Sequence, residues 1–67
     1  MEKGIVKKFD DYKGFGFIIT EDDDEVYFNT RDIHPKYRSR PIREGDTVGF
    51  DLKREHRGDR AVNIRLL

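Results

Sequence analysis

The sequence contains no cysteine among its 67 residues. This absence excludes a disulfide framework and any metal site built on thiolates, and it favours a reducing compartment. No apolar run approaches the roughly 20 residues that a membrane-spanning helix needs. The N-terminal Met-Glu-Lys-Gly lacks the features of a signal peptide. These absences predict a cytoplasmic protein with no membrane partner.

The chain also lacks the residue combinations that support catalysis or metal binding. No Ser/His/Asp or Cys/His arrangement is present, and His34 and His56 stand far apart without further ligands at metal spacing. The run 22–24 is acidic but lacks the glycine and the terminal glutamate of a calcium loop, so a solvated turn is expected there. We therefore predict that the protein is not an enzyme and uses no metal, cofactor or small-molecule substrate.

The charges are balanced in number but unevenly placed. The 14 basic residues equal the 14 acidic ones, and charged residues make up 42% of the chain. Zero net charge argues against a nucleic-acid partner only if the charges are evenly spread. Residues 21–25 hold five of the acids, whereas residues 31–43 hold five basic residues against one acid. The chain outside the acidic run is therefore basic.

Short alternating segments dominate the chain, and alternation is the pattern of half-buried β-strands. The expected strands span residues 3–10, 14–20, 25–30, 47–54 and 60–66, with one helical turn at 31–33 and a loop at 34–45. The expected inward residues are Val6, Ile18, Val26, Phe28, Ile33, Val48, Phe50, Leu52, Val62, Ile64 and Leu66. Five strands in one small domain, residues 1–67, predict an all-β fold. The economical solution is a five-stranded antiparallel barrel of the OB type.

The segment 13–20 carries the strongest functional signal. Phe15 and Phe17 share one face of an extended strand, and Ile18 points to the other. Tyr27 joins the outer face if the next strand pairs antiparallel with this one. Each ring presents about 150–250 Å², so three rings expose about 500 Å² or more. That is near the upper end of what a monomer exposes without a reason, and base stacking is a natural reason where lysines surround the rings.

Several motifs occur in one order along the chain. They are Gly4-Ile5-Val6-Lys7 with Phe9, Lys13-Gly14-Phe15-Gly16-Phe17-Ile18, Asp24-Glu25-Val26-Tyr27-Phe28-Asn29 with Ile33, Glu44-Gly45-Asp46-Thr47-Val48-Gly49-Phe50, and Arg57-Gly58 with Ala61-Val62-Asn63-Ile64. In this order they resemble the bacterial cold shock proteins over essentially the whole length. The run 13–17 alone also fits an RNA-recognition motif, but that fold needs helices that the sequence does not predict.

The resemblance implies an OB-fold that binds single-stranded RNA or DNA without catalysis. It also implies RNA chaperone activity, or control of transcription or translation. The chain departs from the family at Lys8, where tryptophan is usual, and at Asn29-Thr30, where His-Phe is usual. The loop 34–43 is also more basic than is usual in the family. These departures imply a ligand face with fewer rings and more positive charge.

The candidate binding residues combine rings with basic and amide side chains. They are Lys7, Lys8, Phe9, Lys13, Phe15, Phe17, Tyr27, Asn29, Tyr37, Arg38 and Arg57, with Arg40 as a further cation. Rings would stack bases, cations would neutralise phosphates, and Asn29 would bond a base edge. The lysines and arginines are otherwise ordinary solvated surface, and Tyr37 either stacks a base or pins its loop.

A second function remains open at this stage. The three outer rings would also serve a protein-interaction module, in which they meet another protein or a second copy of the chain. A monomer is the expected state, with a dimer as the alternative. Titration with a thymine- or uracil-rich oligonucleotide separates the two functions.

Overall fold

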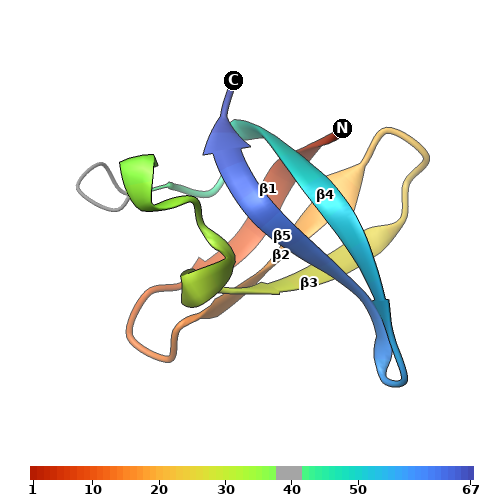
Figure 1. Cartoon of the computed structure of the whole chain (residues 1–67). Helices are drawn as coiled ribbons and strands as arrows, with labels where there is room; N and C mark the ends of the chain where they lie inside the picture. The colour runs from red at the N-terminus through yellow and green to blue at the C-terminus, as the bar shows by residue number, and fades with distance from the viewer. Residues whose placement is uncertain (38–41) are drawn as a thin grey trace.

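The computed structural model is a closed five-stranded barrel (Figure 1), and it describes residues 1–37 and 42–67. The strands are β1 (Glu2–Asp10), β2 (Phe15–Thr20), β3 (Glu25–Asn29), β4 (Thr47–Glu55) and β5 (Gly58–Leu66). Two single 3₁₀ turns, η1 (Thr30–Asp32) and η2 (Pro35–Tyr37), follow β3. The prediction of an all-β barrel is confirmed, and the expected helical turn is present as η1, one residue earlier than predicted.

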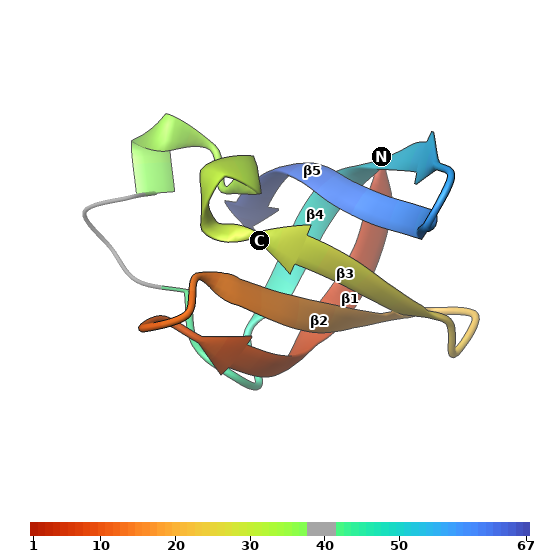
Figure 2. The same ribbon diagram turned by 90° about the horizontal axis from the view of Figure 1, so that it is seen from below.

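The strands close the barrel in the order β1-β2-β3-β5-β4. Four neighbouring pairs are antiparallel, and β3 pairs with β5 in parallel through Tyr27 and Arg60. Figure 2 shows β3 and β5 side by side and running in the same direction. A parallel pair needs a crossover connection, which η1, η2 and β4 provide. The barrel is thus antiparallel except at this one junction.

Ten apolar side chains form the buried core. They are Val6, Ile18, Val26, Phe28, Ile33, Ile42, Val48, Phe50, Ala61 and Ile64. Gly16 belongs to the inward face of β2, where a side chain would collide with the Lys8 carbonyl oxygen and come within 2.6 Å of the Phe28 ring. Glycine there lets β1 cross β2 closely above Phe28, which is why a residue that weakens a strand is tolerated.

Two predicted core residues are wrong. Leu52 lies opposite Ala61 in the β4–β5 ladder but is 39% exposed, because the β4–β5 hairpin runs past the end of the barrel (Figure 1). Val62 is only half-buried. The ladder shifts register between Gly49 and Asp51, and Asn63 has a φ of 52°. An extra residue in β5 breaks the alternation there, so the fully buried positions of β5 are three residues apart rather than two.

Candidate nucleic-acid interface

Three aromatic side chains meet on the outer face of β2 and β3. The ring centroids of Phe15 and Phe17 are 6.1 Å apart, those of Phe15 and Tyr27 6.3 Å, and those of Phe17 and Tyr27 6.0 Å. Tyr27 is 37% exposed, and the two phenylalanines are half-buried. We call Phe15, Phe17 and Tyr27 the aromatic platform. The predicted division of faces is confirmed, because Ile18 and Phe28 point into the core from the same two strands.

A bulge in β1 decides which of its side chains reach this face. The β1–β2 ladder shifts register between Val6 and Lys8, and an extra residue in a strand resets its alternation. Val6 is buried, Lys7 and Lys8 are both exposed, and Phe9 is half-buried. The Phe9 ring packs toward the core, with its centroid 5.6 Å from that of Phe28. Phe9 therefore lies behind the platform rather than among its rings.

One row of residues crosses all five strands through the platform. In the ladders, Lys8 lies opposite Phe17, Phe17 opposite Tyr27, Tyr27 opposite Arg60, and Arg60 opposite Lys53. Directly opposed residues project from the same face of a sheet. Two rings are therefore flanked by one cation on one side and two on the other, and Lys8 Nζ lies 5.8 Å from the centroid of Phe15. Stacked bases with their phosphates at the edges fit this order of groups.

Arg60 is the most firmly held cation beside the platform. Its Nε donates to Asp32 Oδ2 at 2.7 Å and its Nη2 to Asp32 Oδ1 at 2.8 Å, while its Nη1 lies 3.8 Å from Glu55 Oε2. Asp32 is only 8% exposed. The hydrogen bonds with Asp32 raise the pKa of the Arg60 guanidinium above its ordinary value. This bidentate geometry fixes the guanidinium next to Tyr27, in a place that the sequence did not predict.

Asn29 starts η1, and its side chain is partly committed to that role. Its Oδ1 accepts from the Arg31 backbone N–H at 3.1 Å, and its own N–H donates to Asp32 Oδ2 at 2.9 Å. This reciprocal pair is a capping box. The Asn29 Nδ2 group makes no hydrogen bond within residues 1–37 and 42–67. The predicted hydrogen bond to a base edge would therefore be donated by Nδ2.

The model of the "Cold-shock" DNA-binding domain family matches residues 2–67 of the chain. The chain belongs to the cold shock domain family. It is 40% identical over 67 residues to the major cold shock protein of Streptococcus pyogenes serotype M1, covering 100% of this chain and 98% of that protein. It is 39% identical over 66 residues to cold shock protein CspC of Bacillus subtilis strain 168, covering 97% of each. The predicted resemblance is confirmed, and the family is a nucleic-acid-binding one without enzymes.

Two predicted lysines of this cold shock domain lie at the edges of the platform strands. Lys7 Nζ lies 3.1 Å from Glu25 Oε2, and both side chains are well exposed. An exposed pair of this kind contributes little and yields readily to a competing phosphate. Lys13 is exposed in the turn before β2, where its backbone N–H donates to Asp10 Oδ1 at 2.9 Å. Both lysines are exposed, and their contact with phosphates stays a prediction.

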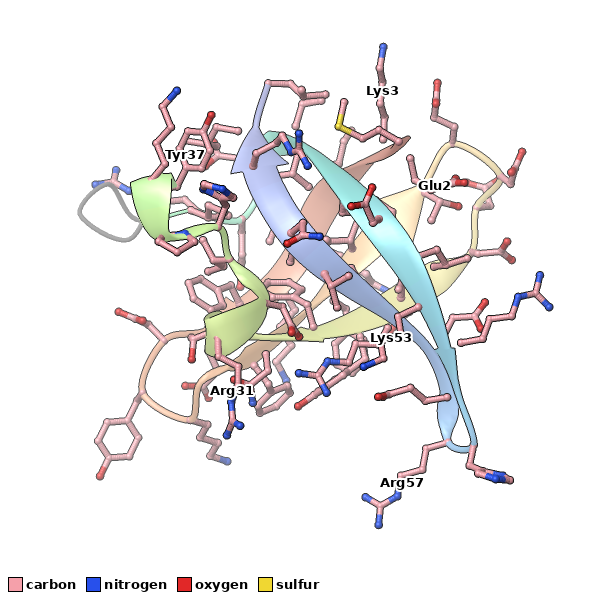
Figure 3. The ribbon with its side chains drawn as sticks, viewed as in Figure 1. Glu2, Lys3, Arg31, Tyr37, Lys53 and Arg57 are labelled. Atoms are coloured by element: carbon pink, nitrogen blue, oxygen red, sulfur yellow. The ribbon has the colours of Figure 1, made fainter. Side chains whose placement is uncertain are left out.

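Two further predicted residues, Arg57 and Tyr37, lie far from each other (Figure 3), and of these Arg57 lines a hollow together with Tyr27. Figure 3 shows Arg57 at the tip of the β4–β5 hairpin and Tyr37 at the opposite side of the barrel. The Tyr37 ring is half-buried against the core, 6.3 Å from the His34 ring, with Lys36 Nζ 5.8 Å from its centroid. This packing favours the role of Tyr37 in pinning the segment. Arg38 and Arg40 lie outside the described residues.

Within the described part of the cold shock domain, no three histidine, cysteine, aspartate or glutamate side chains are grouped to hold a metal ion. No helix there is long and apolar enough to cross a membrane.

Proposed function

We propose that this cold shock domain binds single-stranded RNA or DNA across the aromatic platform. The observation that carries the proposal is the row of cation, ring, ring and two cations that crosses the five strands. Bases would stack on Phe15, Phe17 and Tyr27, at about 1–3 kcal/mol for each stacked base. Lys7, Lys8 and the exposed Lys53 would neutralise phosphates and release counterions.

The cellular consequence that we propose is RNA chaperone activity in the cytoplasm. A protein that captures unpaired strands with little sequence preference shifts the folding equilibrium of RNA toward unpaired states by mass action. This action would need neither ATP nor a metal ion. It would also change the access of other factors to a transcript, which supports a role in the control of transcription or translation. The family match does not favour the alternative of a protein-interaction module.

The test is a binding titration at low salt. A fluorescein-labelled uracil-rich strand and a duplex of the same length are titrated with the protein, and anisotropy is recorded. We expect binding of the single strand and much weaker binding of the duplex. Binding of the two with equal affinity, or of neither, would contradict the proposal.

A second measurement separates a binder from a self-associating module. Sedimentation velocity of the protein alone should give a monomer, because the platform is expected to receive bases rather than a second copy. A dimer that dissociates when Phe17 is replaced by alanine would assign the rings to self-association instead.

A further inference from the structure

We propose that the hollow beside Tyr27 is a base-selective subsite that prefers guanine. This assignment rests on the proposed function and names the ligand chemistry of one place on that surface. The hollow has a volume of about 520 Å³ and is lined by Tyr27, Glu55, Arg57, Gly58, Asp59 and Arg60. Its size lies within the range of about 300–1,000 Å³ that is common for small-molecule sites. It adjoins the platform, because Tyr27 belongs to both.

The charges of this hollow suit a neutral base better than a phosphate. Its walls carry two guanidiniums, of Arg57 and Arg60, and two carboxylates, of Glu55 and Asp59. The Arg60 charge is already neutralised by Asp32, which binds it at 2.7 and 2.8 Å. The charges that remain are those of Arg57, Glu55 and Asp59, and their sum is negative. A negatively charged surface repels a phosphate. A heterocycle stacked on Tyr27 instead meets acceptors and donors on the neighbouring walls.

Guanine matches this set of donors and acceptors more fully than the other bases. Its Watson–Crick edge offers two adjacent donors, N1–H and the N2 amino group, to one carboxylate. Its O6 and N7 accept from a guanidinium, which is a common base contact of arginine in protein complexes. Uracil offers a single N3–H between two carbonyl oxygens. Bases of single strands are read on both of these edges while they are stacked on aromatic side chains.

Most residues of the hollow belong to strands, and only Arg57 lies in the turn between β4 and β5. Glu55 ends β4, and Asp59 and Arg60 follow in β5, where the ladder pairs Arg54 with Asp59 and Glu55 with Gly58. The pair with Asp32 fixes Arg60 from the side of η1. Three elements, β4, β5 and η1, therefore converge on one side of Tyr27 and fix Arg60 there, and fixed donors and acceptors discriminate between bases better than mobile ones.

The first test places a single guanosine at each position of a labelled uridine hexamer in turn. At one position we expect binding about fivefold to a hundredfold tighter than for the all-uridine strand, as for one bidentate base contact. Inosine at that position lacks the N2 amino group and should lose most of this gain. A ratio below twofold at every position would overturn the subsite while leaving the proposed function intact. If neither strand binds, the proposed function fails and the subsite with it.

The second test replaces the two carboxylates of the hollow. The variant Glu55→Gln with Asp59→Asn removes two negative charges, so it should tighten binding of every strand. A matched control, Glu21→Gln with Asp22→Asn, removes the same charge from the acidic turn between β2 and β3. We expect the guanosine-to-uridine ratio to fall toward one in the hollow variant only. Equal guanosine-to-uridine ratios in the two variants would overturn the assignment. If the hollow variant does not fold, the inosine measurement on the wild-type protein tests the preference for guanine instead.

Discussion

The proposed interface joins two regions that fix their side chains by different forces. On β2 and β3, Phe17 stands between the buried residues Gly16 and Ile18, so the rings are positioned by the packing beneath them. On β5, Arg60 is held by two hydrogen bonds to Asp32. The packing under the rings is insensitive to salt and pH but is weakened when a side chain loses volume. The ion pair of Arg60 is weakened when a charge is removed. The two regions should therefore fail under different substitutions.

The largest effect is expected from loss of volume under the rings. Phe28 is completely buried and lies against Gly16 and Phe9. Phe28→Ala should cost about 3–5 kcal/mol of unfolding free energy. A domain of this size is only marginally stable, so this variant should be largely unfolded. Urea denaturation followed by circular dichroism measures the effect, and a loss below about 1 kcal/mol would contradict the assigned core.

Removing the charge of Asp32 should produce the next largest effect. Asp32→Asn keeps a capping oxygen for the Asn29 N–H but leaves Arg60 without its carboxylate. Breaking a fully buried pair costs about 3–5 kcal/mol, and about 2 kcal/mol is expected here because the Arg60 side chain is 25% exposed. The matched control Glu25→Gln breaks the exposed pair with Lys7 and should cost less than about 1 kcal/mol. Equal losses of unfolding free energy in the two variants would remove the distinction between the regions.

Loss of a platform ring should weaken binding more than folding. Phe17→Ala should reduce the binding free energy of a uracil-rich strand by about 1–3 kcal/mol, as for one lost stack. Tyr12 provides the control, because its ring is 98% exposed in the turn before β2 and lies outside the platform. Tyr12→Ala should bind as the wild type does. An unfolded Phe17 variant with unchanged binding per folded molecule would show that the ring belongs to the core.

The smallest expected effect concerns Lys8, which stands over the platform where relatives of the family usually carry a ring. Lys8→Trp should tighten binding by about 1 kcal/mol, at the low end for one stacked base. It should also make the dependence of log K on log salt shallower by about 0.7, the value for one phosphate contact on a single strand. Titrations at two salt concentrations measure both quantities. Unchanged affinity together with an unchanged slope would place Lys8 outside the path of the ligand.

The sequence was sufficient to predict the fold and the platform because alternation is uninterrupted in β2 and β3. The outward positions of Phe15, Phe17 and Tyr27 followed from the alternation of side chains along a strand. Prediction failed at Val62, because the residue inserted in β5 at Asn63 turned this side chain partly outward. A bulge in β1 places Phe9 half-buried beside Phe28, which alternation alone did not show.

Other features depend on contacts that no local pattern records. Asp32 and Arg60 are 28 residues apart and meet only because β3 and β5 are parallel neighbours. The spacing of Asn29 and Asp32 did offer a signal for the cap that starts η1. Ile42 is fully within the core although it stands alone among polar residues in a segment predicted as loop, and an isolated apolar residue has no period to reveal it.

The junction of β3 and β5 has a consequence for how the barrel opens. Its backbone is closed by one ladder pair, by the bridge between Ile33 and Ile64, and by the bond from the His34 N–H to the Ile64 carbonyl oxygen at 2.9 Å. The pair of Asp32 with Arg60 adds a side-chain contact across it. The other junctions carry longer ladders, so we expect the backbone to open at this seam more easily than at the others. A nucleic-acid strand lying from Phe17 across Tyr27 to Arg60 spans that seam. A bound strand would therefore contact both sides of the junction and stabilise it against local unfolding.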